Sequence, residues 1–135
     1  MKKLFSCALL IACFISSTGQ NTLIDEIFKK QFQGKWSADT KYQTNTIEIK
    51  FEAGKNYATV IDIGSGEAPP MRLQAFRQHN KLIINPIVHR SDYCELAVKN
   101  GKLIFKTYPT IWDSNNKPKP PGKNFVTTVF SKSKK

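Results

Sequence analysis

The chain has 135 residues, of which 40% are apolar and 23% are charged, and its formal net charge is +11. This composition fits one soluble globular domain with a modest core and excludes a disordered polymer. Seven Gly and seven Pro lie mostly at turn positions, which excludes a collagen-like chain. The sequence contains no phosphate-binding loop, metal-ligand cluster or nucleophile motif, so neither an enzyme nor a metal or cofactor site is expected.

Residues 1–19 have the pattern of a signal peptide. Two lysines are followed by an apolar run over 4–15 and by small residues at a suitable cleavage point. The run is too short to cross a bilayer, so we expect no transmembrane segment. The residues before Cys13 resemble the lipobox of bacterial lipoproteins, which gives an alternative with a lipid anchor at this cysteine. We therefore expect a periplasmic or secreted protein whose folded domain spans 20–135.

A short amphipathic helix is predicted next, before a region of strands. Its apolar face comprises Ile24, Ile27, Phe28 and Phe32. Thr22 is placed to cap its first turn, which also contains Asp25, and Gly34 ends it. A helix with one apolar face must pack against an apolar surface.

Alternation of apolar and polar residues predicts strands over the rest of the chain. It is strictest over 46–52, where one side of the strand must face a core and the other water. The eight candidates are 35–39, 45–53, 56–63, 70–78, 81–88, 92–99, 102–111 and 124–132. Pro86 indicates a bulge or a free edge within its strand. Cys94, the one cysteine of 20–135, alternates with polar neighbours and is expected to be buried; a reactive thiol is the alternative.

The turns between these strands differ in length. Short turns are expected at Ala53–Lys55, His79–Asn80 and Asn100–Gly101, and longer loops over 40–44, 64–69, 89–91 and 112–123. Short and long connections alternate, and in an up-and-down meander alternate connections lie at the same end. The pattern predicts an all-β fold, an eight-stranded antiparallel up-and-down barrel with a closed base and an open mouth. The alternative is an α+β fold with the helix on an open, curved sheet.

Gly34-Lys35-Trp36, between the helix and the first strand, resembles the Gly-x-Trp signature of the lipocalins. The later pattern Ile47-x-Ile49-x-Phe51-x-x-Gly54-x-x-Tyr57 and the Asn100-Gly101 turn look like the small lipocalin-like domains of bacterial exported proteins. The resemblance implies that Gly34 and Trp36 are structural, with the Trp packed across the closed end. In lipocalins the Trp is often covered by an Arg near the last strand, where this chain offers Lys132.

Positive charge is concentrated at the C-terminal end. Residues 99–135 contain nine lysines and one acidic residue, Asp113. Such a field attracts anionic ligands, lipid headgroups or acidic proteins. Nucleic acid is not expected as a partner, because the signal exports the chain and clustered arginines are missing.

The expected mouth is the place where binding residues would gather. The candidate ligand-binding residues are Lys41, Tyr42, Arg90, Trp112, Lys117, Lys119 and Lys123. Aromatic and cationic side chains suit a small hydrophobic or amphipathic anion with its apolar part in the barrel. The alternative is an inhibitor or immunity-type module that binds an acidic envelope protein through the Pro-rich loop 113–123. An internal cavity would favour the first function, and a filled interior with an ordered, projecting loop would favour the second.

Overall fold

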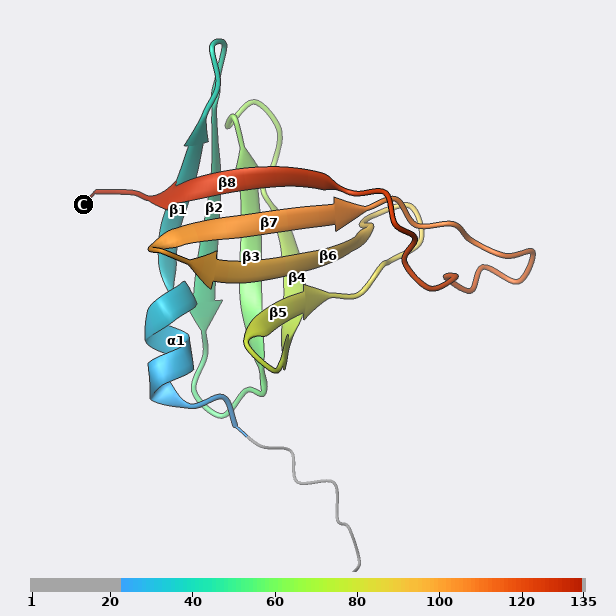
Figure 1. Ribbon diagram of the computed structural model, residues 1–135, viewed down its shortest axis with the longest axis horizontal. Coiled ribbons are helices and arrows are strands. Elements are labelled where there is room, and N and C mark those ends of the chain that lie inside the picture. Colours follow the sequence, from blue (N-terminus) through green and yellow to red (C-terminus); the bar gives the residue numbers. More distant parts are fainter. Residues whose placement is uncertain (1–22, 135) are drawn as a thin grey trace, which may run out of the picture.

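The structure is a computed structural model that describes residues 23–134. The expected signal, Cys13 and Thr22 lie outside the described residues. One short helix precedes eight antiparallel strands that follow one another around a closed barrel (Figure 1). The elements are α1 (Glu26–Phe32), β1 (Gly34–Asp39), β2 (Thr44–Phe51), β3 (Tyr57–Gly64), β4 (Met71–Gln78), β5 (Lys81–Ile84), β6 (Tyr93–Lys99), β7 (Lys102–Tyr108) and β8 (Val126–Lys132). The barrel closes by pairing of β1 with β8, which confirms the predicted fold class and excludes the open sheet.

Two strands end well before their predicted ends. β5 ends at Ile84 rather than 88, and β7 ends at Tyr108 rather than 111. Each end is followed within two residues by a proline, Pro86 or Pro109, which has no amide proton to donate to a neighbouring strand. The proline positions therefore set these two strand ends.

The inward side chains fill the barrel. The apolar core comprises Ile24, Phe28, Phe32, Trp36, Ala38, Ile47, Ile49, Ala58, Val60, Leu73, Ala75, Leu82, Ile84, Cys94, Leu96, Leu103 and Phe130. Within the described residues no buried side-chain nitrogen or oxygen lacks a hydrogen-bond partner. The interior of the barrel is thus occupied by apolar side chains.

The helix covers the closed end of the barrel, but it begins later than predicted. Asp25, expected in the first turn, is instead the N-cap, and its side chain accepts a hydrogen bond from the Phe28 amide at 2.8 Å. Ile27, predicted on the apolar face, is 75% exposed. The buried residues Ile24, Phe28 and Phe32 are spaced by four and form a narrow stripe, so Ile27, about 100° of helix rotation away from Phe28, faces solvent.

Trp36 joins the helix to the barrel. Its side chain is 1% exposed, and its Nε1 donates a hydrogen bond to the Phe32 carbonyl at 2.8 Å. The Lys132 ammonium lies 5.3 Å from the ring centroid, so a lysine on β8 covers this tryptophan. Gly34 has φ +126°, and a Cβ there would approach Lys132 Cε to 3.2 Å. Trp36 is thus buried where the helix meets the first strand, at the closed end of the barrel.

The connections alternate between the two barrel ends as the meander requires, but their lengths differ from the prediction. The expected long loop at 40–44 is a four-residue turn, because the Thr40 amide and hydroxyl both donate to the Gln43 carbonyl, at 2.9 Å. The expected short turn at 53–55 spans the five residues between β2 and β3. We call the end with α1 and the turns 52–56, 79–80 and 100–101 the closed end, and the opposite end the open end.

Candidate functional site

One small cavity at the open end lies between β2, β3, β7 and β8. Its volume is about 260 Å³, and it is lined by Asn45, Ile47, Asp62, Gly64, Phe105, Thr107, Thr128 and Phe130. Asp62 Oδ1 accepts a hydrogen bond from the Gly64 amide at 3.0 Å, and within the described chain it has no ion-pair partner. None of the predicted cationic residues lines this cavity. Its negative side chain therefore makes it a poor place for the acidic head of an anion.

A second pocket lies between the two long loops of the open end. It has a volume of about 310 Å³ and is lined by Ile87, His89, Arg90, Ser91, Asp92 and Trp112. Two of the predicted site residues, Arg90 and Trp112, thus come together although they are 22 positions apart in the sequence. The pocket combines an aromatic wall, an apolar side chain and a guanidinium, which is the chemistry that suits a carboxylate carried on an apolar group.

Local hydrogen bonds fix the first wall of this pocket. Ile87 and Ser91 bond to each other through their backbones, at 2.9 and 3.0 Å, and close a tight turn. His89 has φ +58° in this turn, and the Arg90 amide donates to the Ile87 carbonyl at 2.9 Å. The turn therefore presents Arg90 from an ordered backbone.

The second wall is tied to the first. Asp92 Oδ1 accepts a hydrogen bond from the Thr110 amide at 3.0 Å, and Thr110 Oγ1 accepts one from the Tyr93 amide at 3.0 Å. Asp92 lines the pocket, but one of its carboxylate oxygens is hydrogen-bonded to the Thr110 backbone amide. The two loops are therefore held together at the base of the pocket.

The loop 113–123, which we call the basic loop, is ordered by a turn at its beginning. Asp113 Oδ1 accepts hydrogen bonds from the Asn115 and Lys117 amides at 2.8 and 2.9 Å. Trp112 pairs with Pro118, and the Lys119 amide donates to the Ile111 carbonyl at 2.8 Å. The loop projects away from the barrel (Figure 1), and its lysines 117, 119 and 123 are exposed. Its one carboxylate is used within the turn, so its outer surface is cationic.

Lys41 and Tyr42 do not join this group. They lie at the tip of the β1–β2 hairpin, which points away from the basic loop (Figure 1). Tyr42 is 87% exposed, and the Lys41 ammonium lies 5.4 Å from its ring centroid. The structure therefore does not bring all seven predicted residues together at one mouth. Arg90 and Trp112 line one pocket beside the basic loop, and Lys41 and Tyr42 lie apart from them.

Other chemically active groups are engaged elsewhere. Cys94 is buried, as predicted, and burial raises the pKa of its thiol to about 11. On the outer face, Lys81 Nζ lies 2.9 Å from Glu95 Oε2, and this hydrogen bond raises the pKa of Lys81. Partial burial, followed by the Glu95 charge, raises the pKa of Tyr93 and Tyr108 beside it. Residues 23–134 bring no three potential metal ligands together.

Sequence reasoning missed Ile87 and Asp62. Asp62 could have been found, because it continues the inward alternation of Ala58 and Val60 on β3. Ile87 lies beyond the end of β5, in a turn whose shape no alternation predicts.

Comparison with protein-family models, curated proteins and solved structures found no match to this chain. Among the described residues, no helix has the length and apolar character needed to cross a membrane.

Proposed function

We propose that this protein is a non-catalytic, lipocalin-like binding protein that recognises an acidic protein through the basic loop and the pocket at its base. The sequence suggested two functions, a small-ligand carrier and a protein-binding module. A filled interior and an ordered, projecting loop favour the protein-binding module. The barrel core is packed, and the basic loop is held by the Asp113 turn. The export pattern of residues 1–19 places such a function in the periplasm or outside the cell, with a lipid anchor at Cys13 as the alternative.

One observation carries the proposal. Arg90 and Trp112 share a pocket of about 310 Å³ directly beside a loop that exposes three lysines. An acidic side chain on an extended partner segment could bind Arg90, while an apolar neighbour packs on Trp112 and further carboxylates meet the loop lysines. Ile111 is exposed next to them and extends the apolar contact area.

A fluorescein-labelled hexaglutamate peptide tests this proposal, with fluorescence anisotropy as the readout and hexalysine as the peptide control. We expect K117E/K119E/K123E to weaken hexaglutamate binding at least about tenfold, since each reversed charge removes one attraction and adds one repulsion. The matched control is K30E/K35E/K134E, which makes the same charge change at the closed end and should alter the affinity less than about twofold. Trp112→Ala should weaken binding as well, because it removes the aromatic wall.

Equal effects of the two triple variants would contradict the proposal, because binding would then follow net charge alone. If hexaglutamate binds as expected, capture from an envelope extract that hexaglutamate competes away would identify the natural partner.

A small amphipathic anion is the second candidate, because the pocket beside Arg90 is close in size to a small-molecule site. Native mass spectrometry of the purified protein separates the two candidates. A co-purifying small acid that is lost in Arg90→Ala supports the small ligand, and bare protein that still binds hexaglutamate supports the protein partner.

A further inference from the structure

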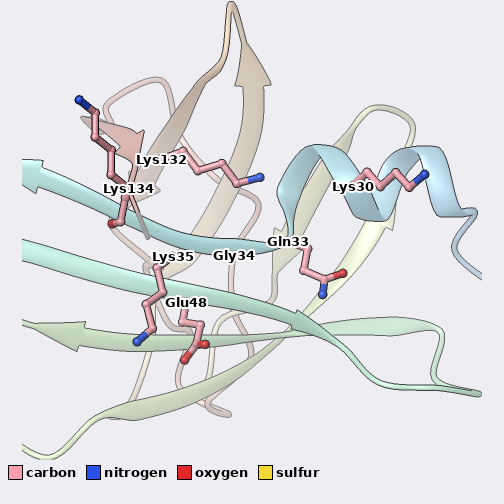
Figure 2. Close-up of a pocket in the computed structure, with 8 residues that line it drawn as sticks. Lys30, Gln33, Gly34, Lys35, Glu48, Lys132 and Lys134 are labelled. Carbon is pink, nitrogen blue, oxygen red and sulfur yellow. The ribbon is translucent and has the colours of Figure 1, made fainter.

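Another pocket, larger than the two at the open end, lies at the closed end of the barrel. Its volume is about 770 Å³, and it is lined by Lys30, Gln33, Gly34, Lys35, Glu48, Lys132, Ser133 and Lys134. Figure 2 shows that these residues come from the end of α1, the start of β1, β2 and the end of β8. The Lys132 side chain extends toward the helix, and Lys35 and Glu48 extend from neighbouring strands (Figure 2).

The positive charge of this cleft is not neutralised by the described part of the chain. Its one carboxylate, Glu48, lies 3.5 Å from the Lys50 ammonium. Within residues 23–134, Lys30, Lys35 and Lys134 form no ion pair. Four lysines and one glutamate line the cleft, so its net charge is positive and it attracts an anionic surface.

Exposed apolar side chains lie on the helix that forms one side of the cleft. Ile27 is 75% exposed, and Leu23, which precedes the N-cap, is 62% exposed. Ile27 and Lys30 are three positions apart on α1, so they share the solvent-facing side of the helix. The acidic residues of the helix are already paired: Glu26 with Lys29 at 2.8 Å, and Asp25 with Arg77.

We propose that the closed end docks on an anionic phospholipid surface, with phosphate groups at the cleft lysines and with Ile27 and Leu23 in the headgroup region. The apolar face of α1 is packed on the barrel, so Ile27 and Leu23 are the apolar side chains it leaves for the membrane. Buried apolar area and attraction between cations and anionic lipids both add to binding at a membrane surface. A soluble anion would use the lysines but would leave the two apolar side chains in water. The combination therefore favours a lipid surface over a free phosphate.

Docking in this way directs the basic loop away from the membrane, because the β7–β8 connection and the closed end lie on opposite sides of the barrel (Figure 1). The closed end and the basic loop can therefore bind their partners at the same time. Substitutions at one of these surfaces leave the other unchanged.

Co-sedimentation of the full chain with vesicles tests the inference. Pure phosphatidylcholine vesicles measure any binding through the apolar run 4–15. The increase in the partition coefficient when phosphatidylglycerol is added, which we call the phosphatidylglycerol gain, measures the contribution of charge to binding. Each lysine near such a surface is worth about a fivefold change in partitioning, so K30E/K35E/K134E should reduce this gain by about 100-fold or more. Lys132 is left intact because it covers Trp36. Ile27→Gln, at an exposed helical position, should reduce binding to the mixed vesicles about tenfold.

The matched control is K117E/K119E/K123E, whose charge change is the same and which should keep the phosphatidylglycerol gain within about threefold of the unmodified chain. Equal losses in both triple variants would overturn the inference, because attraction would then reflect net charge alone. Displacement by inorganic phosphate at constant ionic strength would also overturn it, since that result identifies a free-anion site. Unchanged binding of Ile27→Gln would contradict the docking geometry. Failure here leaves hexaglutamate binding untouched, so the two proposals stand or fall separately.

Discussion

Replacement of Trp36 by phenylalanine tests how the helix is attached to the barrel. The indole Nε1 donates to the Phe32 carbonyl at 2.8 Å, and the whole side chain is 1% exposed. Phenylalanine keeps an aromatic ring at this position but cannot donate the hydrogen bond. The Phe32 carbonyl at the end of α1 would lose its indole partner inside the core.

Two losses add up to the expected effect. A buried carbonyl left without its partner costs about 1–3 kcal/mol, and the smaller ring leaves a cavity that costs about 1–2 kcal/mol. We therefore expect Trp36→Phe to lower the free energy of unfolding by about 2–5 kcal/mol. This is a large share of the roughly 5–15 kcal/mol that is typical of a domain. Lys132→Met should cost about 0.5–1 kcal/mol, because it removes only the ammonium above the ring.

Urea unfolding followed by far-ultraviolet circular dichroism measures these changes, because this signal does not depend on the number of tryptophans. Trp112→Phe is the matched control: the same chemical change at a half-buried loop position should cost less than about 1 kcal/mol. The reasoning fails if the free energy of unfolding of Trp36→Phe lies within about 0.5 kcal/mol of that of the unmodified chain. It also fails if Trp36→Phe and Trp112→Phe lower the free energy of unfolding equally.

Three further predictions follow from single residues. Gly34→Ala should destabilise the fold by about 1–3 kcal/mol in the same assay, since φ is +126° and the new methyl group would approach Lys132 Cε to 3.2 Å. Cys94 should react with iodoacetamide about 100-fold more slowly in the folded than in the urea-unfolded chain, because its pKa of about 11 leaves very little thiolate. A hydrogen bond from a helix amide, followed by one from Arg77, lowers the pKa of Asp25. The charged carboxylate therefore stabilises the fold at neutral pH, and Asp25→Asn should lower the stability there. This loss of stability should disappear as the pH falls below 3.8, the ordinary pKa of the group, because the carboxylate is then protonated in the unmodified chain as well. Thermal unfolding measured against pH checks this.

The barrel fold could be predicted because the alternation that identifies a strand is visible within each strand's own sequence. Alternation along 46–52 identifies an inward and an outward side without reference to any partner, and eight such segments with hairpin turns leave few ways to close a sheet. The strand ends were less predictable, since 81–88 looks apolar throughout and only Pro86 indicates where the pairing stops. Ile27 was misplaced because helical spacing alone does not tell how wide a stripe the barrel covers.

The site was only partly predictable, because it depends on how far apart loops at one barrel end lie. Sequence order places the loops of Tyr42, Arg90 and Trp112 at the same end, but not at the same point on its rim. Arg90 and Trp112 are brought together by the Asp92–Thr110 hydrogen bond between their loops. The β1–β2 hairpin instead extends away on its own, closed by Thr40.

The distribution of paired charge leaves unpaired lysines on the two surfaces that we propose to bind anionic partners. Several carboxylates near the helix and on the barrel wall have cationic neighbours: Asp25 has Arg77, Glu48 has Lys50 and Glu95 has Lys81. Asp113 is used by backbone amides. The described cations left without a carboxylate include the lysines of the basic loop and those of the closed-end cleft. Lys117, Lys119 and Lys123 at one end, and Lys30, Lys35 and Lys134 at the other, therefore keep their charge available to an external anion, as the two proposals require.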